Sequence, residues 1–483
     1  MSQPIAARLT FGVMLAGLLL AAGAIIRPTA ARSAQPPAGA GLVITGGIVV
    51  TMDASARVLR PGAVAIAGSV ITAVGDPESV RRANPTARVL DAGGAIVLPG
   101  LINTHTHAPM VMYRGLADDL ALTEWLEEHI FPAEAGTVSP SFVRVGTRLA
   151  ALEMIRSGTT MYADMYYFEE EIARETRRAG LRGVLGQTVI GFPAPDAKTP
   201  ADALARARRF IDEFAGDPLI MPAVAPHSMY HVDRETLLAC RDLARSKNVP
   251  LLIHLAETQD EIRIARERHQ ATPVGFLESI GFWAPVTVAA HGVWASADDI
   301  RILAERRVGV AHNPESNMKL ASGTAPVPAY FKAGVRLSLG TDGAASNNDL
   351  DMFEAMRQAA LLHKLTTGDP EAVPARMALE MATIGGARVL GLHHLVGSLE
   401  PGKRADLIVV GMRKARHTPL YDPISHLVYV ARGDDVETTV VNGRVLMEGG
   451  RVLTLDEPAV IDEARRLAAE VRRAVADGLQ ARD

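Results

Sequence analysis

The sequence predicts an α/β fold, namely a (β/α)8 barrel of the TIM type joined to a composite β-sandwich built from both chain ends. Between residues 98 and 395, eight short apolar strand-like runs alternate with amphipathic helical stretches, which is typical of βα units. Short β-type runs with glycine turns lie before and after this region, and neither group can bury both of its faces alone. The alternative is a doubly wound open sheet, disfavoured because no glycine-rich phosphate loop follows the first run.

Composition bounds the possible functions. The chain has 483 residues, enough for one large domain and a smaller one, with 48% hydrophobic and 22% charged residues. The net charge is −4 and no basic stretch stands out, so we expect no nucleic-acid partner. The single cysteine, Cys240, excludes an intramolecular disulfide and a cysteine zinc cluster, and we expect it in a helix core.

Residues 1–40 differ in kind from the rest. Arg8 precedes an apolar stretch from Leu9 to Ile26, and small residues with candidate cleavage positions at Ala31 and Ala34 follow. This pattern predicts a bacterial secretory signal peptide and a periplasmic or secreted protein. The stretch is also long enough for an uncleaved inner-membrane anchor, the only membrane attachment that we expect. A misassigned start codon is the third alternative.

The elements follow in order. Residues 41–97 contain β-type runs at 42–45, 47–52, 63–66 and 70–74, which predict the first part of the sandwich. The barrel, 98–395, contains runs at 98–105, 158–164, 183–190, 220–227, 249–254, 286–291, 308–312 and 335–342. Helices are expected at 259–268 and 352–364, among others. Residues 396–454 return to β-type runs at 405–410, 438–441 and 443–447, and 455–483 contain a closing amphipathic helix at 457–480.

Polar residues at the ends of four of these runs suggest a metal centre. His105 and His107 end the first run, and residues two apart on a strand project to one side. His254, His291 and Asp342 end three others, and the carboxyl ends of barrel strands share one rim. Their nitrogen and oxygen donors suit Zn²⁺, with Fe²⁺ or Mn²⁺ possible. His291 is either a direct metal ligand or a residue that acts from outside the coordination shell. Glu257, three residues after His254, is near enough to transfer protons at the metal-bound water.

The strand 220–227 carries no lysine that could be carbamylated to bridge two metals, so one ion per subunit is the simpler interpretation. We also expect a homo-oligomer.

Several motifs resemble those of the amidohydrolase superfamily, in the branch of 5′-methylthioadenosine/S-adenosylhomocysteine deaminases. They are Leu98-Pro-Gly-Leu-Ile-Asn-Thr-His-Thr-His, His254-Leu-Ala-Glu, Ala289-Ala-His-Gly, His312-Asn-Pro-Glu-Ser-Asn and Leu339-Gly-Thr-Asp-Gly. The resemblance implies a metal-dependent hydrolytic deaminase of an adenosine-type nucleoside, namely 5′-methylthioadenosine, adenosine or S-adenosylhomocysteine. In such an enzyme a metal-bound hydroxide attacks the amino-bearing ring carbon and ammonia is released.

The resemblance also implies individual roles. His105, His107, His254 and Asp342 hold the metal, and Glu257, His291 and Asp342 are catalytic. Glu257 protonates the ring nitrogen, His291 polarises the water, and Asp342 accepts the proton of the water.

Four residues are implied to bind substrate: Glu257 again, Trp125 along the thioether arm, Glu134 at the ribose hydroxyls and His227 at the ring. Each of three residues also has a structural interpretation without substrate binding. Trp125 could belong to an ordinary helix core, Glu134 could be a solvated acid in a loop, and His227 could be a hydrogen-bonded residue at a strand end.

One departure from the family concerns the substrate. Members that use S-adenosylhomocysteine carry arginines after the third strand to hold its carboxylate, whereas here no arginine lies between Arg182 and Arg206. Lys198 is the only cation in that interval, so we expect 5′-methylthioadenosine or adenosine to be preferred. Within the superfamily, the alternatives are a guanine, 8-oxoguanine or s-triazine aminohydrolase or a cyclic amidase. Outside it, the alternative is a secreted binding protein that has lost catalysis.

Overall fold

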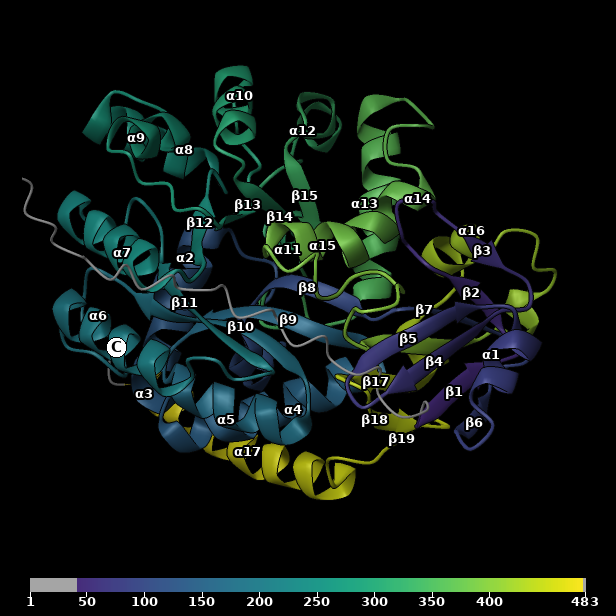
Figure 1. Cartoon of the computed structure of the whole chain (residues 1–483). Coiled ribbons are helices and arrows are strands. Elements are labelled where there is room, and N and C mark those ends of the chain that lie inside the picture. Colours follow the sequence, from purple (N-terminus) through teal and green to yellow (C-terminus); the bar gives the residue numbers. More distant parts are fainter. Residues whose placement is uncertain (1–40, 481–483) are drawn as a thin grey trace, which may run out of the picture. The chain divides into compact units, whose positions relative to one another are not determined.

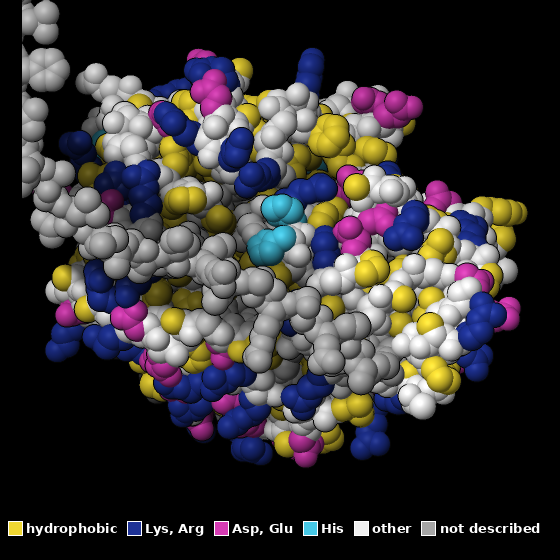
Figure 2. Space-filling view, in the orientation of Figure 1, with side chains coloured by type: hydrophobic (Ala, Val, Ile, Leu, Met, Phe, Trp, Pro, Cys, Tyr) yellow, Lys and Arg dark blue, Asp and Glu magenta, His cyan; other side chains and the backbone are white. Residues whose placement is uncertain are grey.

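The structure is a computed structural model that describes residues 41–480, with side chains to residue 476. The predicted leader and its cleavage positions lie outside the described residues. Among the described helices, none is both long and apolar enough to cross a membrane. On the face shown in Figure 2, the Lys and Arg side chains are interspersed with Asp and Glu.

Eight parallel strands form the barrel sheet in sequential order, each followed by helix (Figure 1). They are β8 (Leu101–Thr106), β9 (Thr159–Tyr166), β10 (Arg182–Val189), β11 (Ile220–Pro226), β12 (Leu251–Leu255), β13 (Thr287–His291), β14 (Gly309–His312) and β15 (Arg336–Leu339). A doubly wound sheet would reverse direction within its strand order, and this sheet does not. The predicted barrel is therefore confirmed, and the open-sheet alternative is wrong.

Helices cover the outside of this sheet and fill the connections (Figure 1). They are η1 (Ala108–Tyr113), α2 (Leu122–Glu124), η2 (Trp125–Ile130), α3 (Phe131–Thr137), α4 (Pro140–Arg156), α5 (Glu169–Ala179), α6 (Pro200–Glu213), α7 (Arg234–Lys247), α8 (Gln259–His269), α9 (Pro273–Ser279), α10 (Ala297–Glu305), α11 (Pro314–Lys319), α12 (Val327–Ala333), α13 (Met352–Thr367), α14 (Ala375–Glu380), η3 (Met381–Gly385) and α15 (Gly386–Val389). Side-chain caps fix several starts, such as Asp233 on α7 and Thr258 on α8. Cys240 is buried in α7, as predicted.

Both chain ends contribute to a second group of strands. One sheet has the order β5-β4-β1-β6, and a larger one the order β19-β18-β17-β16-β7-β2-β3. The strands before the barrel are β1 (Leu42–Thr45), β2 (Ile48–Val50), β3 (Val58–Leu59), β4 (Ala63–Ala67), β5 (Val70–Gly75), β6 (Arg88–Asp91) and β7 (Ala95–Pro99), with helix α1 at Pro77–Ala83. Those after it are β16 (Leu407–Gly411), β17 (Val436–Val441), β18 (Arg444–Glu448) and β19 (Arg451–Val452). Strands β7 and β16 pair antiparallel and join the two ends, which confirms the composite sandwich.

The first predicted run is divided between these two parts. Pro99 ends β7 in the sandwich, and after Gly100 the chain enters β8 in the barrel at Leu101. A Cβ at Gly100 would lie 2.1 Å from the Thr160 side chain, so this crossing needs glycine. Leu98 and Pro99, which the sequence placed in the barrel, therefore belong to the sandwich sheet.

The remaining elements complete the C-terminal part. Short helices η4 (Ala415–His417), α16 (Pro423–Tyr429) and η5 (Gly433–Asp435) precede β17, and α17 (Glu457–Gln480) closes the chain as predicted. Helix α17 packs against α3 and α4 (Figure 1). The barrel interior is filled by small and branched side chains, such as Ala223 and Val288, with η3 and α15 packed beneath them through Ile384 and Ala387.

Candidate active site

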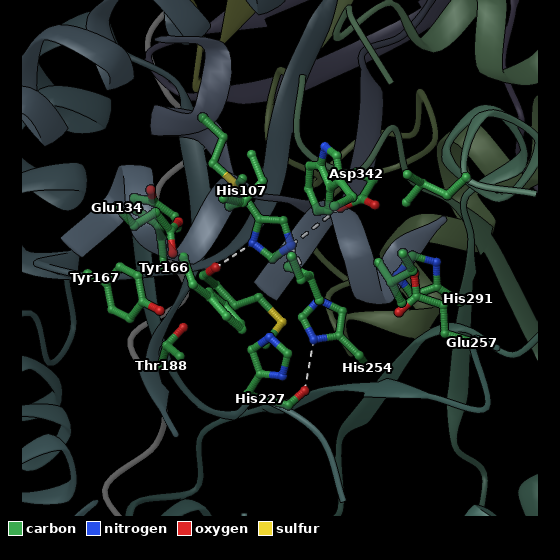
Figure 3. Close-up of a pocket in the computed structure, with 18 of the residues that line it drawn as sticks. His107, Glu134, Tyr166, Tyr167, Thr188, His227, His254, Glu257, His291 and Asp342 are labelled. Carbon is green, nitrogen blue, oxygen red and sulfur yellow. Dashed lines mark hydrogen bonds and ion pairs between the residues drawn. The ribbon is translucent and has the colours of Figure 1, made fainter. Parts of the chain in front are cut away.

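The predicted site residues converge at the carboxyl ends of the barrel strands. His105 lies in β8, His107 directly follows it, and His254 lies in β12. His291 ends β13, whereas Asp342 lies three residues beyond the end of β15. Two overlapping groups form, His105 with His107 and His254, and His105 with His291 and Asp342. Within each group the possible ligand atoms lie within 4.8 Å of one another. Figure 3 shows His107, His254, His291 and Asp342 around one pocket.

Backbone carbonyls fix the orientation of two of the imidazoles. His107 Nδ1 lies 2.6 Å from the Met165 carbonyl oxygen, and His254 Nδ1 lies 2.8 Å from that of His227 (Figure 3). Because a carbonyl can only accept, each Nδ1 carries the proton and each Nε2 carries a lone pair. The two Nε2 atoms nevertheless lie 3.2 Å apart. Two lone pairs at this distance repel each other unless a cation lies between them.

Asp342 completes the donor set. Its Oδ1 lies 3.3 Å from both His105 Nε2 and His107 Nε2. Its Oδ2 accepts hydrogen bonds from Ser316 (2.7 Å) and Ser346 (2.9 Å), which aim the other oxygen at the histidines. His105 Nε2 is buried and makes no hydrogen bond among the described residues. Three convergent imidazole nitrogens and one carboxylate oxygen fit a divalent metal ion such as zinc.

The protonation states suit metal binding. Burial lowers the pKa of His105 to about 4, against the opposing effect of Asp342, and holds the pKa of His254 well below its ordinary value. Both imidazoles are therefore neutral near pH 7 and able to bind a metal. Burial acts to raise the pKa of Asp342, but the neighbouring histidines hold it well below its ordinary range.

The pKa of Glu257 is shifted in the opposite direction from that of Asp342. It is 5% exposed, two residues beyond β12, and burial together with the negative charge of Asp342 raises its pKa well above the ordinary value. Its Oε1 lies 3.7 Å from His291 Nε2. Its backbone N–H donates to Glu261 (2.9 Å), which holds the residue at the pocket. A protonated carboxyl beside a metal site can serve as a general acid.

His291 and Asp342 also share an unusual backbone conformation. Their φ angles are 74° and 64°, in the left-handed region that non-glycine residues seldom adopt. The ring of His291 is held by Asn317, whose Oδ1 lies 2.9 Å from His291 Nδ1. Backbone strain of this kind is characteristic of functional sites.

The predicted substrate residues line the same pocket. Trp125 lies in the short π-helix η2 and is 5% exposed, and its Nε1 has no partner among the described residues. Glu134 lies in helix α3 and is 4% exposed, so the alternative of a solvated loop acid is wrong. His227 directly follows β11, with its Nδ1 3.2 Å from Ser228 Oγ and 3.3 Å from His231 Nδ1. All three side chains contribute to the pocket wall.

Much of the rest of the wall is apolar, and among the described residues no Lys or Arg lines it. The apolar lining comes from Met110, Leu122, Leu126, Ile130, Phe131 and Leu320. The first arginine after β10, Arg206, forms ion pairs with Glu170 and Asp196, and Lys198 is exposed. The side of the pocket near β10 therefore contains no cation to bind a carboxylate.

Several residues that contribute to the site were not predicted from the sequence. Tyr166 and Tyr167 lie beside Glu134 in the pocket (Figure 3). Burial raises the pKa of Glu134 to about 7, while the two phenols act in the opposite direction. The predicted second strand stopped at residue 164, whereas β9 continues to Tyr166, so a longer strand would have found that side chain. Ser316 and Asn317 stood within a quoted motif, but nothing there indicated contacts with Asp342 and His291.

Comparison with known proteins agrees with this geometry. The model of the Amidohydrolase family matches residues 96–446. A 5-methylthioadenosine/S-adenosylhomocysteine deaminase of Syntrophobacter fumaroxidans is 48% identical over 433 residues, covering 90% of this chain and 99% of that protein. A 5′-deoxyadenosine deaminase of Methanosarcina acetivorans is 48% identical over 434 residues, covering 89% and 98%.

A solved structure is also similar. The crystal structure of an adenosine deaminase from Xanthomonas campestris with bound zinc superposes with a TM-score of 0.89 at 38% identity. The match covers 91% of this chain and 100% of that one. Together with the family match over most of the barrel and sandwich, these similarities establish the kinship that the motifs predicted. The chain belongs to the amidohydrolase family.

Proposed function

We propose that this protein is a metal-dependent hydrolytic deaminase of adenosine-type nucleosides that carry an uncharged 5′ group. The observation that carries the proposal is the juxtaposition of two features in one pocket. Candidate metal donors from three histidines and an aspartate meet at its wall, and beside them lies a buried carboxyl whose pKa is raised well above its ordinary value. A structural metal site has no use for such a proton donor, which argues against a binding protein without catalysis. The relatives named as adenosine-type deaminases support the same conclusion.

In this proposal His105, His107, His254 and Asp342 hold one zinc ion per subunit, with Fe²⁺ or Mn²⁺ as alternatives. The bound ion lowers the pKa of water toward about 7, so that a nucleophile is available near neutral pH. Metal analysis of the purified protein tests the stoichiometry. One equivalent per chain is expected, and two equivalents would contradict the single-ion site.

The chain's own residues move the protons. Glu257 donates its proton to the ring nitrogen beside the amino-bearing carbon, and this makes that carbon more electrophilic. Asp342 accepts a proton from the attacking water. That proton passes to the leaving amino group, which departs as ammonia. The second proton of the water returns to Glu257, and the ring keeps the oxygen of water as a carbonyl. His291, fixed through Asn317, orients the attacking water.

Recognition follows from the pocket wall. Glu134 accepts hydrogen bonds from ribose hydroxyls, with Tyr166 and Tyr167 beside it, and His227 contacts the ring. Trp125 and its apolar neighbours pack against the 5′ substituent. Since the described part of the pocket has no Lys or Arg, the carboxylate of S-adenosylhomocysteine lacks a partner there. We therefore expect 5′-methylthioadenosine, 5′-deoxyadenosine and adenosine to be better substrates.

The experiment is an ammonia-release assay of the zinc-loaded protein on a substrate panel. It compares those three nucleosides with S-adenosylhomocysteine, guanine, 8-oxoguanine and s-triazines. The expected result is a kcat/KM for 5′-methylthioadenosine at least about tenfold above that for S-adenosylhomocysteine, the effect of losing one charge-assisted contact. Equal values would overturn the 5′ selectivity. Turnover of guanine or triazines alone would overturn the nucleoside assignment.

A further inference from the structure

The barrel has a seam where the regular ladder of backbone hydrogen bonds is interrupted, although the Asp342 N–H still donates to the His105 carbonyl across it. Each neighbouring pair from β8 through β15 forms a parallel ladder, but within residues 41–480 no ladder joins β8 to β15. These two strands carry or lead to His105 and Asp342, which face each other across the seam at 3.3 Å. Two proposed metal ligands therefore depend on contacts other than a ladder for their relative position.

The side chain of Asn103 makes the contacts that a ladder would make. Its Nδ2 donates to Thr341 Oγ1 at 2.6 Å, and its Oδ1 accepts from the Thr341 backbone N–H at 3.1 Å. The same Oδ1 lies 3.4 Å from the His105 backbone nitrogen, which donates to it. Thr341 Oγ1 in turn donates to the Asp342 carbonyl at 3.0 Å. One fully buried carboxamide thus holds the segment next to each ligand.

The backbone around Asn103 is built for close approach. Asp342 N–H donates to the His105 carbonyl at 2.9 Å. At Gly340 a Cβ would lie 2.4 Å from Asn313 Oδ1 and 3.0 Å from the backbone nitrogen of His105, so only glycine fits. The segment from Gly340 to Asp342 is therefore pressed against β8, where Asn103 fastens it.

A second side-chain contact crosses the seam. Thr104 Oγ1 lies 2.7 Å from Ser338 Oγ and donates to the Leu339 carbonyl at 2.8 Å. Both of its partners belong to β15 itself, three and four residues before Asp342, whereas Asn103 bonds to Thr341 directly before it. Thr104 therefore fastens β15 itself rather than the residue next to Asp342, which makes it a matched control.

We propose that Asn103 is a positioning residue for the metal site, holding Asp342 at the distance from His105 that a metal ion requires. The proposal deepens the proposed function because it rests on the same metal site. Groups that orient metal ligands from outside the coordination shell typically change metal affinity by about 10–100-fold when they are removed. Loss of the Asn103 carboxamide should therefore weaken metal binding more than loss of stability alone explains.

The test compares Asn103→Leu with Thr104→Val, two substitutions that replace a polar side chain by an apolar one with the same branching at buried seam positions. Zinc affinity is measured by competition with a chromophoric chelator, and Tm is measured on the apoproteins. We expect Asn103→Leu to raise the zinc Kd at least about tenfold and to alter the visible spectrum of the cobalt-substituted protein. Thr104→Val should lower the apoprotein Tm. It should leave the zinc Kd within about threefold of wild type, because a contact that acts independently of the metal ligands changes the free energy of metal binding little.

Two outcomes would overturn the proposal. One is an unchanged zinc Kd in Asn103→Leu, and the other is an equal weakening of zinc binding in Thr104→Val. If Asn103→Leu does not fold, Asn103→Asp decides, since it keeps the acceptor for Thr341 N–H but loses the donor to Thr341 Oγ1. An intermediate loss of zinc affinity is expected, and wild-type affinity would again contradict the proposal. Zinc binding by wild type without deamination would refute the proposed function while leaving this inference intact.

Discussion

At the scale of single residues, the histidines of the site differ from ordinary buried histidines in what their second nitrogen faces. A satisfied core histidine uses both nitrogens in hydrogen bonds. Here the Nδ1 atoms of His107 and His254 are bonded to carbonyls, while their Nε2 atoms face each other at 3.2 Å. Such an arrangement is favourable only around a positive charge, so the residues alone indicate a metal.

The proposed role of Glu257 predicts a specific defect. Glu257→Gln keeps the shape of the side chain but cannot donate an acidic proton. We expect kcat to fall about 10²–10⁴-fold, the usual contribution of a general acid. Bound zinc, measured by metal analysis, should stay at the wild-type level. Glu267→Gln, an exposed change on α8, is the control and should leave kcat unchanged. Ammonia release at the wild-type rate by Glu257→Gln would refute the mechanism.

The raised pKa of Glu134 predicts that its carboxylate lowers the folding stability at neutral and higher pH, while its charge favours substrate binding. Burial raises its pKa from 4.5 to about 7 in the folded protein. The unfolded chain therefore ionises first as the pH rises, and stability falls between pH 4.5 and about 7 and then stays level. Glu134→Gln removes this penalty of about 3 kcal/mol above pH 7. Its Tm should exceed that of wild type at pH 8 and nearly equal it at pH 5.

The same substitution should impair substrate binding. Loss of the charged acceptor for ribose hydroxyls is expected to raise KM about 10–100-fold at pH 8, because hydrogen bonds to a charged group are worth about 1.5–3 kcal/mol. Tm and KM are measured on the same preparation. A Tm below wild type at pH 8 would show that the carboxylate is satisfied in the folded protein. An unchanged KM would remove Glu134 from the ribose site.

At the scale of elements, hydrophobic periodicity predicted most barrel strands to within about two residues. Helix α17 begins and ends at the predicted residues. Two differences have physical causes. The run around Pro99 reads as one strand because both halves are apolar, yet the chain changes sheet at Gly100. The run before Asp342 reads as strand to its end, whereas β15 stops at Leu339 and a tight glycine-rich segment carries the aspartate.

The packing of helix α17 on α3 predicts that a change in α17 alters substrate binding. It packs on α3, the helix that carries Glu134 on its opposite, pocket-facing side. Val471 of α17 is 3% exposed, so Val471→Asp places a charge in an apolar contact and should undock the helix at a cost of several kcal/mol. We expect a lower Tm and a higher KM, with zinc affinity unchanged. Arg472→Asp, an exposed change one residue away, is the control. A lower Tm with wild-type KM would show that α17 supports the fold alone.

At the scale of the whole molecule, the sequence located the metal site better than the substrate site. His105, His107, His254, His291 and Asp342 lie at or just beyond the carboxyl ends of barrel strands, and barrel topology brings all such ends to one rim. Trp125, Glu134 and Tyr167 lie in connections whose path depends on packing between distant segments. Their place in the pocket followed from family resemblance or was missed, because no periodic pattern encodes it.

The coupling of the two parts predicts how the protein responds to metal removal. The described residues, 41–480, belong to one compact unit, and β7 of the sandwich passes into β8 of the barrel through Gly100 alone. A ligand that binds only the folded state at 1,000 times its Kd stabilises it by about 4 kcal/mol. Because the proposed ligands lie on both sides of the barrel seam, we expect the metal to stabilise the whole unit. Chelation should then lower the Tm of a single unfolding transition.

Scanning calorimetry of the holoprotein, the chelated protein and the zinc-restored protein tests this expectation. Zinc should restore the original Tm, and magnesium, which prefers six oxygen ligands, should not. His254→Asn supplies the control, since a protein that has lost this ligand should show the same Tm with and without chelator. Two separate transitions, of which only one shifts, would mean that the sandwich unfolds independently of the barrel. An unchanged Tm on chelation of the wild-type protein would mean that the four donors hold no metal, because a bound ion necessarily stabilises the state that binds it.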